Sequence, residues 1–367
     1  MQSLEFEYDF HKNHSLQLKK NVYFGKGLCG ILNIGNTCFI NSILQCLSNT
    51  LKLTDYFLST NYRNDYTNKD HKNEFYILNS YITLINNIWD ENQLIKPKSF
   101  VENLSKFHKK YFTLEQQDSH ECLLYILELL HSALSYEIEI EIKGEIKTQS
   151  DKLMKKSLEK WKNFYEKEYS FIIETFNGLL INNIKCTNQK CNYSDEIFEP
   201  YNTLSISLPE TTGSLYDCLD LFFSQNVNIN TWKCELCKNN GCTKNVNLWS
   251  LPNNLIINLK RFKNNDNFIN KNNNVINFPL KDLDLTKYVS KNKCDVNNYI
   301  YDCYAINYHS GNLKGGHYWA ACKNLDGNWY NFDDGNVYKY NDTPNLITND
   351  AYILFFTRKM LKKTLLI

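Results

Sequence analysis

A cysteine at the start of an apolar helical pattern is the first residue whose position could support chemistry. In "GILNIGNTCFINSILQCLSNT", residues 30–50, Cys38 follows a turn-like segment with two glycines. Apolar residues at three- and four-residue spacing come directly after it, which predicts a buried helix face. One interpretation is a small buried thiol at a helix end. The other is a nucleophile, because a helix N-terminus lowers the pKa of a thiol. This stretch alone leaves both interpretations open.

A histidine and two aspartates near the other end of the chain could complete such a site. His317 follows two glycines at the start of one alternating segment, and Asp333 and Asp334 lie near the end of the next. A hairpin of these segments would bring Asp333 close to His317 across the ladder. Cysteine catalysis needs a base within hydrogen-bond reach and a group that orients this base. Cys38, His317 and Asp333 therefore predict these three roles, with the nucleophile early and the histidine late as in papain-like chains.

Each of these residues alone has a plainer interpretation. His317 could be an ordinary hydrogen-bonded or surface histidine, and two aspartates before a glycine are typical of a turn. His309 is a competing base in the same region, although it lies at a predicted strand end before a loop. The hypothesis of a catalytic site therefore depends on the combination of residues.

Four cysteines in two pairs predict a structural metal site. Cys234 and Cys237 form a C-x-x-C motif, and Cys186 and Cys191 form a looser pair with four residues between them. Two such pairs on neighbouring hairpins could close a tetrahedral zinc site, and four thiolates would leave no open position for a substrate. The alternative is incidental buried thiols, since Cys242 lies nearby without an evident role.

Composition and charge limit the class of protein and its partners. The 367 residues are 43% hydrophobic, enough for one large or two ordinary domains. Lys plus Arg number 41 against 40 Asp plus Glu, so we expect no nucleic-acid or membrane partner. The chain has no apolar run that could span a membrane and its first residues lack a signal-peptide pattern. Thirteen cysteines in such a chain favour metal or catalytic roles, and a cytoplasmic or nuclear location.

The hydrophobic patterns predict an α+β protein with helices first and strands later. Helical spacing covers 74–90, 99–112 and 116–134, and the last of these begins with Asp118 as an N-cap and Glu121 three residues later. Residues 136–147 alternate as a strand or hairpin, and 150–170 are charged and either helical or a loose insertion. Two-residue periodicity then predicts strands within 171–186, 201–208, 245–262, 299–311, 317–324 and 351–358.

Four segments together resemble a known family. "GLCGILNIGNTCFINSILQCLSN", "QQDSHECL", "LPNNLIINLKRF" and "GGHYWAACKNLDGNWYNFDDGNV" are similar, in order and spacing, to successive motifs of the ubiquitin-specific proteases, a family of deubiquitinases. The resemblance implies a papain-like cysteine peptidase fold of the ubiquitin-specific protease type. It divides the chain into an N-terminal extension (1–26), a catalytic domain (27–358) and a short tail (359–367). The domain would hold a helical thumb (about 28–135), zinc-bearing β fingers (about 175–250) and a β-sheet palm from the remainder.

The resemblance also implies a role for each residue of the catalytic site. Cys38 would be the nucleophile, His317 the general base and Asp333 the acid that orients this base. Asn33, five residues before the nucleophile, corresponds to the amide that stabilises the oxyanion. Asp334 stands where it could assist or replace the orienting acid. The implied reaction is hydrolysis of the isopeptide or peptide bond after the C-terminal glycine of ubiquitin, through a thioester on Cys38.

A second set of residues would contact the substrate. Asp118 resembles the residue that pairs with an arginine of the ubiquitin tail, with Gln117 and Glu121 beside it. An N-cap aspartate could keep one oxygen outward for this role. Gly315 and Gly316 would help to form a channel too narrow for side chains, which suits the Gly-Gly end of ubiquitin.

The chain departs from the family pattern at several positions. Zinc would be held by Cys186, Cys191, Cys234 and Cys237, but the first pair has a wider spacing than usual, and Cys242 is an available substitute for Cys186. Cys122 stands where phenylalanine is more frequent, and Trp319 where smaller residues are usual. We expect a monomer that binds ubiquitin and ubiquitinated proteins. A peptidase for another ubiquitin-like modifier, or a silent ubiquitin-binding protein, are the alternatives.

Overall fold

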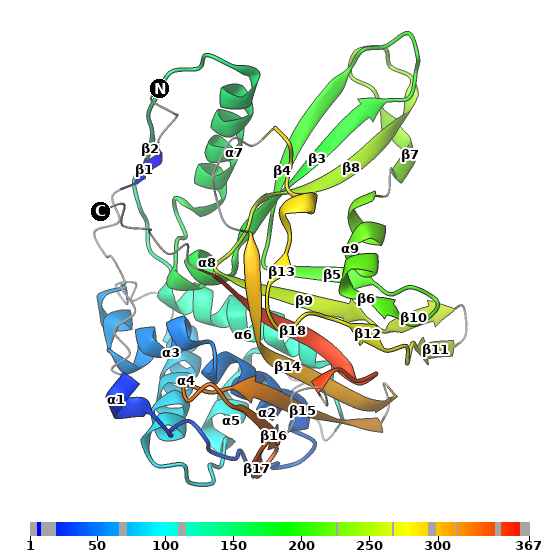
Figure 1. The fold of residues 1–367 in the computed structure, drawn as a ribbon. Helices are drawn as coiled ribbons and strands as arrows, with labels where there is room; N and C mark the ends of the chain where they lie inside the picture. The colour runs from blue at the N-terminus through cyan, green and yellow to red at the C-terminus, as the bar shows by residue number, and fades with distance from the viewer. Residues whose placement is uncertain are drawn as a thin grey trace, which may run out of the picture.

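The structure is a computed structural model that describes residues 6–8, 20–65, 72–108, 115–224, 227–265, 268–292, 299–312, 315–341 and 346–359. A group of helices from the first part of the chain packs against one end of a large sheet, and a second sheet extends away from both (Figure 1). Residues with helical periodicity therefore precede those with strand periodicity, and the predicted α+β class is confirmed.

The helical group contains the nucleophile candidate at a helix start. Helix α2 begins at Cys38 itself, and all eleven of its residues are buried because it packs between other helices and the large sheet. The predicted helices at 74–90 and 116–134 are present, and α5 covers the first part of the one predicted at 99–112; residues 109–112 lie outside the described residues. The helices of this group are α1 (Lys20–Tyr23), α2 (Cys38–Ser48), α3 (Leu51–Leu58), α4 (Lys72–Asp90), α5 (Lys98–Phe107) and α6 (Ser119–Leu134), with a 3-10 turn η1 at Asn61–Asn64.

An eight-stranded sheet carries the histidine and the aspartates. Its order is β17-β16-β15-β14-β18-β9-β5, with β13 paired to β14, and its neighbours are antiparallel except β5 and β9. Side chains of β14, β15 and β18 pack against α2 and α6 in one continuous core. The strands are β5 (Thr203–Ser207), β9 (Asn254–Lys260), β13 (Leu283–Asp284), β14 (Ile300–Asn312), β15 (Gly315–Lys323), β16 (Trp329–Asp333), β17 (Asn336–Lys339) and β18 (Ala351–Arg358).

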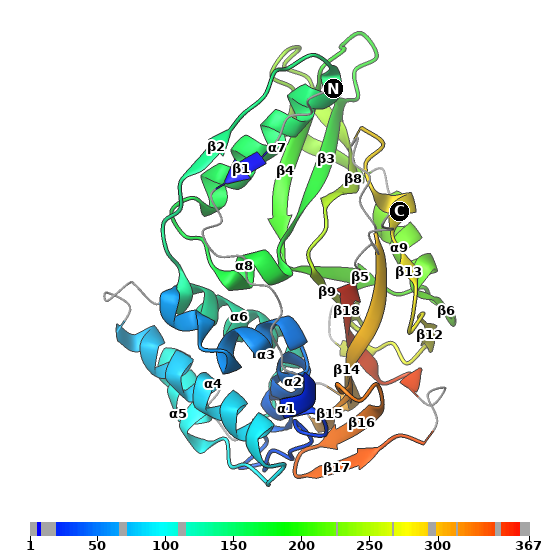
Figure 2. The same ribbon diagram turned by 60° about the vertical axis from the view of Figure 1, so that its left-hand side comes forward.

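A four-stranded antiparallel sheet, ordered β4-β3-β8-β7, projects from the rest of the molecule (Figure 2). Helix α7 (Gln149–Tyr165) packs against β4, and α9 (Leu215–Ser224) packs against β8. The strands of this sheet are β3 (Gly178–Cys186), β4 (Ser194–Tyr201), β7 (Val227–Lys233) and β8 (Asn240–Ser250). Smaller pairs join β1 (Phe6–Tyr8) to β2 (Ile140–Ile142), β6 (Gly213–Ser214) to β12 (Ile276–Asn277) and β10 (Phe262–Asn265) to β11 (Phe268–Lys271), and a 3-10 turn η3 spans Thr286–Tyr288.

One strand prediction was wrong at its beginning. Residues 171–176 form the short helix α8 (Phe171–Phe176), and β3 begins only at Gly178. The Ser170 side chain caps α8 by accepting a hydrogen bond from the backbone N–H of Ile173. The apolar run at the start of this segment is typical of a strand as well as of a buried helix. Because α8 buries almost all of its side chains, it lacks the polar face that distinguishes a surface helix. The charged segment after residue 149 is a regular helix, α7, with a Thr148–Asp151 capping box.

A buried polar bridge ties the nucleophile's helix to the sheet. The Asn307 side chain, fully buried on β14, donates from Nδ2 to Ser42 Oγ of α2 at 2.8 Å. Its Oδ1 accepts from Ser119 Oγ at the start of α6, also at 2.8 Å. Because a buried amide without partners is costly, this bridge fixes the register of α2 against β14. Among the described residues, no helix is both long and apolar enough to cross a bilayer.

Candidate active site

The loop before α2 is held in place by the turn that carries the aspartates. The backbone N–H of Ile31 donates to the carbonyl oxygen of Asp334 at 2.8 Å. At Gly30 a Cβ would lie 2.3 Å from the carbonyl oxygen of Gly335, so only glycine allows the two chain segments to approach this closely. This contact joins residues more than 300 positions apart and brings the start of α2 to the end of the sheet.

Asn33 is fixed at both ends of its amide. Its Oδ1 accepts from the backbone N–H groups of Gly35 and Thr37, each at 3.1 Å, and from the Thr37 hydroxyl at 3.3 Å. Its Nδ2 donates to Asp334 Oδ2 at 2.9 Å. An amide nitrogen carries two hydrogens, so the second hydrogen of Asn33 Nδ2 can donate to another acceptor. The geometry therefore suits a preorganised donor.

His317 lies between Cys38 and Asp333. Its Nε2 is 2.6 Å from Asp333 Oδ1, which leaves Nδ1 for the Cys38 side chain. A hydrogen bond with Cys38 is the largest cause that raises the pKa of His317 to about 9, and Asp333 raises it further, while partial burial opposes both. The imidazole is therefore held in the protonated form at neutral pH. Cys38 is only 1% exposed, whereas the side chains of His317 and Asp333 are each 41% exposed.

Asp334 has a different set of partners from its neighbour. Its Oδ2 accepts from Asn33, its Oδ1 accepts from Asn41 Nδ2 of α2 at 2.8 Å, and its backbone has a left-handed φ of 48°. One of its side-chain oxygens lies within 4.8 Å of a ring nitrogen of His317 and of a carboxylate oxygen of Asp333. The sequence predicted an assistant or substitute for the orienting acid. The structure joins Asp334 to the loop and helix that carry Asn33 and Cys38, and the role of assistant or substitute for the orienting acid stays a prediction.

His309, the competing base, is buried away from solvent in the aromatic core. It is 1% exposed, its Nδ1 has no hydrogen-bond partner in the part of the chain that the structure describes, and its ring packs on Tyr318 and Phe262. Burial first, then the charges of Lys271 and His317, lowers the pKa of His309 to about 4. A histidine in this position stays neutral and is a poor candidate for the base.

Gln116 is a residue of the site that the sequence reasoning missed. It forms two hydrogen bonds with the backbone of Gly316, since its Oε1 accepts from the Gly316 N–H at 2.6 Å and its Nε2 donates to the Gly316 carbonyl oxygen. The "QQD" motif contains Gln116, whereas the resemblance implies a substrate contact only for its second glutamine, Gln117. The pair of bonds connects the segment before α6 to the strand that carries His317.

The two glycines before His317 differ in their surroundings. A Cβ at Gly316 would lie 2.3 Å from the Ser310 carbonyl oxygen and 2.4 Å from His309 Nε2, whereas a Cβ at Gly315 would meet no atom of the described residues within 4 Å. Packing therefore requires glycine only at position 316.

Asp118 caps α6, as predicted. Its Oδ1 accepts from the backbone N–H of His120 at 2.6 Å and, more weakly, from that of Glu121 at 3.4 Å. The other carboxylate oxygen, Oδ2, is the one predicted to stay free for the substrate, and it accepts a hydrogen bond from the Tyr352 hydroxyl at 2.6 Å. Glu121 is exposed and Gln117 is half-buried. Cys122 is fully buried in the helical core, in agreement with a packing role at that position.

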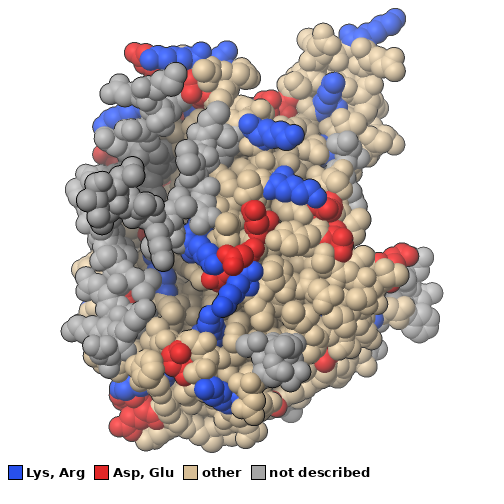
Figure 3. Space-filling view, in the orientation of Figure 1, with Lys and Arg blue, Asp and Glu red and all other residues tan. Residues whose placement is uncertain are grey.

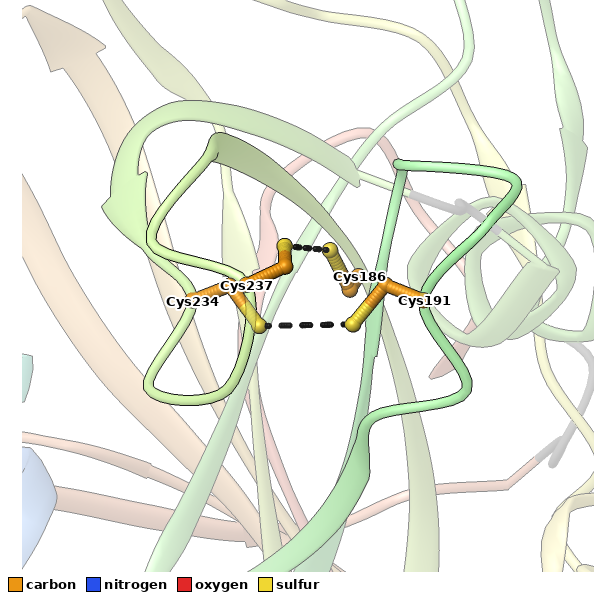
Figure 4. Close-up of side chains that lie close together, drawn as sticks. All are labelled: Cys186, Cys191, Cys234 and Cys237. Atoms are coloured by element: carbon orange, nitrogen blue, oxygen red, sulfur yellow. Dashed lines mark hydrogen bonds between the residues drawn. The ribbon is translucent and has the colours of Figure 1, made fainter.

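The four predicted metal ligands lie together at the far end of the four-stranded sheet (Figure 4). Cys186 Sγ is 3.7 Å from Cys237 Sγ, and Cys191 Sγ is 3.7 Å from Cys234 Sγ. A tetrahedral zinc centre with Zn–S distances of about 2.3 Å places its sulfurs about 3.8 Å apart. The donor set and its spacing therefore fit zinc. Cys242 is fully buried opposite Cys186 on β8 and stands outside the cluster.

Comparison with known families bears on the whole of this arrangement. A family model described as ubiquitin carboxyl-terminal hydrolase matches residues 29–356, which include every residue of the site. The chain belongs to the ubiquitin carboxyl-terminal hydrolase family. The predicted resemblance to ubiquitin-specific proteases is thereby confirmed.

Individual relatives support the assignment of this ubiquitin carboxyl-terminal hydrolase family member. The chain is 33% identical over 352 residues to ubiquitin carboxyl-terminal hydrolase 2 of Bos taurus, an alignment that covers 92% of this chain and 56% of the relative. It is 29% identical over 446 residues to a probable ubiquitin carboxyl-terminal hydrolase, R319, of Acanthamoeba polyphaga mimivirus, covering 95% and 94%. The chain thus spans little more than half of the bovine relative.

Solved structures agree on the fold. The chain is similar to a structure described as the SAGA Ubp8/Sgf11/Sus1/Sgf73 DUB module bound to ubiquitin aldehyde, with a TM-score of 0.70 and 24% identity, over 92% of this chain and 70% of the other. The predicted fold class, a papain-like cysteine peptidase of the ubiquitin-specific protease type, is confirmed for this family member.

Proposed function

We propose that this chain is a thiol-dependent deubiquitinase, which cleaves the isopeptide or peptide bond after the C-terminal glycine of ubiquitin. The observation that carries the proposal is His317, hydrogen-bonded to Asp333 at 2.6 Å on one side and to Cys38 on the other. The family of the chain and the names of its relatives support the choice of ubiquitin as the modifier.

Cys38 is the nucleophile of the proposed reaction. Its thiolate, at the positive end of the α2 dipole and beside the protonated His317, attacks the carbonyl carbon of the terminal glycine. His317 then protonates the departing lysine amine, and the thioester forms. In the second half, His317 takes a proton from water, which attacks the thioester and releases ubiquitin. Asp333 keeps the imidazole ring in the orientation that both steps require.

Two donors stabilise the oxyanion of each tetrahedral intermediate. One is Asn33 Nδ2, whose amide is fixed by Thr37 and Asp334. The other is the backbone N–H of Cys38, because the first N–H groups of a helix have no partner within the helix. Removal of one such donor typically costs on the order of 10²–10³ in kcat.

The ubiquitin tail runs between the helical group and the eight-stranded sheet in this proposal. Gly315 and Gly316 line the channel near His317, and Asp118, with Gln117 and Glu121, faces the basic residues of the tail. Asp118 Oδ2 accepts from Tyr352 at 2.6 Å but retains lone-pair capacity for an arginine. The body of ubiquitin rests against the four-stranded sheet, which corresponds to the fingers, with the helical group as thumb and the large sheet as palm.

Zinc is a structural element of the proposed enzyme. Cys186, Cys191, Cys234 and Cys237 would hold the ion and tie the β3–β4 turn to the β7–β8 turn. The ion takes no part in catalysis, because four thiolates complete its coordination.

We further propose that the protein is a monomer in the cytoplasm or nucleus. On the face drawn in Figure 3, basic and acidic side chains intermingle.

The proposal is tested with ubiquitin whose C-terminus is joined to a fluorogenic amine. The native chain should release the amine, and Cys38→Ala should abolish release while ubiquitin binding, measured by titration, remains. Cys242→Ala is the matched control, since this buried thiol lies outside the site. Hydrolysis by Cys38→Ala at the native rate would exclude the mechanism.

A further inference from the structure

A tryptophan stacks on the imidazole ring of the candidate base. The rings of His317 and Trp319 have centroids 6.2 Å apart and an interplanar angle of 17°. Trp319 also stacks on Tyr308, with centroids 5.2 Å apart and an angle of 10°. The rings of His317 and Tyr308 are thus both nearly parallel to that of Trp319, and these three neighbouring rings are called the column below. The family resemblance predicts a smaller residue at position 319.

The sheet register explains why the column forms and why it is rigid. His317 and Trp319 lie two residues apart on β15, so their side chains project from the same face. Tyr308 is directly opposite Trp319 on β14, and a buried Tyr308 hydroxyl donates to the Leu346 carbonyl oxygen at 2.7 Å. Tyr308 is 1% exposed. The column thus rests on a side chain that the core does not allow to move.

We propose that Trp319 is a positioning residue for the general base, which holds the His317 ring between Cys38 and Asp333 and stabilises its protonated form. This inference rests on the proposed function. A ring held on one face cannot rotate about its side-chain bonds, and an aromatic face attracts a cation. Since 41% of the His317 side chain is exposed, the hydrogen bonds to its two nitrogens are open to competition from water unless the ring is held from the side.

Four other titratable groups face His317 and act on the same proton. Cys38 from α2 and Asp333 from β16 raise its pKa, and Asp334 lies close by in the turn after β16. His309 on β14 remains neutral, because burial first, then the charges of Lys271 and His317, lowers its pKa to about 4. Substitution of Trp319 leaves these four groups in place. It should therefore shift the pH dependence of activity without abolishing catalysis.

The test compares Trp319→Leu with Trp319→Phe, which keeps an aromatic ring on the imidazole. Iodoacetamide alkylates the thiolate of Cys38, and peptide mass spectrometry follows this reaction against pH without any ubiquitin. For Trp319→Leu, the pH of half-maximal alkylation should rise, and kcat on a ubiquitin substrate at pH 7 should fall about two- to tenfold at unchanged KM. The alkaline limit of kcat should move to lower pH. Trp319→Phe should retain most of the native kcat and most of the native pH dependence of alkylation and of kcat.

The controls separate positioning from folding and from substrate choice. Tyr338→Thr removes an exposed aromatic ring from β17, which β16 separates from β15, and should leave both profiles unchanged. If Trp319→Leu does not fold, as judged by thermal unfolding, Trp319→Thr carries the same comparison. Native profiles in a folded non-aromatic variant, or equal impairment in Trp319→Phe, would overturn the proposal. A shifted alkylation profile in a chain that does not cleave ubiquitin would support it and reject the proposed substrate.

Discussion

Two adjacent aspartates are bound to different parts of the site. Asp333 contacts the base His317, whereas Asp334 contacts Asn33 and Asn41, on the side of the nucleophile. Asp334 has a left-handed backbone, with φ of 48°, whereas Asp333 is the last residue of strand β16. We infer that the two residues support different steps, protonation of the leaving amine and stabilisation of the oxyanion.

Substitution of each aspartate should give a distinct kinetic signature. Asp333→Ala leaves His317 unoriented, so kcat should fall by about 10²-fold or more and the alkaline limit of kcat should move to lower pH. Asp334→Ala releases Asn33, so kcat should fall toward the loss expected for one oxyanion donor, on the order of 10²–10³, with a smaller change in the pH profile. Steady-state kinetics across pH measures both.

A double-mutant cycle checks that Asp334 acts through Asn33. The variant with both Asn33→Ala and Asp334→Ala should be little slower than Asn33→Ala alone, because the two residues support one donor. Multiplicative losses would mean that Asp334 acts independently of Asn33.

The pH dependence of activity follows from the state of His317. Its pKa is raised to about 9, so the folded enzyme keeps the imidazolium above the ordinary value of 6.5 and loses it as pH rises through about 9. The imidazolium donates the proton to the leaving amine, and kcat/KM should therefore decline on the alkaline side near pH 9. A profile of kcat/KM between pH 6 and 10 measures this, and a decline centred near 6.5 would contradict the raised pKa of His317.

At the scale of elements, the close packing of β14 and β15 determines which glycine is needed. Gly316→Ala places a methyl group against Ser310 and His309, so the free energy of unfolding should fall by about 1–3 kcal/mol. Gly315→Ala is the control, because a Cβ there meets no atom in the described part of the chain within 4 Å. Chemical denaturation of both variants provides the comparison, and equal stability of the two would show that β14 and β15 separate more easily than their packing indicates.

Local patterns predicted the elements that carry chemistry better than the contacts between them. The apolar spacing after Cys38 and the alternation around His317 were sufficient to predict α2 and the β15–β16 hairpin. The role of Asp334 was not accessible, because its contact with Asn33 joins positions 301 residues apart and depends on a left-handed turn. The hydrogen bonds between Gln116 and Gly316 join positions 200 residues apart, so local patterns did not predict them either.

In the molecule as a whole, the proposed nucleophile and the proposed base lie on different halves of the fold. Cys38 begins a helix of the helical group, while His317 and Asp333 belong to the eight-stranded sheet (Figure 1). The Asn307 bridge and the contact of Gly30 with Gly335 join the halves on either side of the site. The catalytic geometry therefore depends on the packing of helices on the sheet, which no single motif determines.

The four-stranded sheet should depend on zinc at its far end. Purified protein should contain about one zinc per chain by elemental analysis, and removal by a chelator should lower its thermal stability. Cys186→Ser should lose the zinc, and Cys242→Ser, which changes the thiol opposite Cys186 on β8, should keep it. Loss of zinc in the Cys242 variant alone would replace Cys186 by Cys242 as the ligand.

The most direct test of the central claim uses ubiquitin with a C-terminal electrophile, beside the same probe built on other ubiquitin-like modifiers. After incubation with each probe, intact-mass spectrometry detects any covalent product. The account predicts an adduct with the ubiquitin probe on Cys38, which Cys38→Ala does not form. An adduct with another modifier alone, or a ubiquitin adduct that persists in Cys38→Ala, would contradict it.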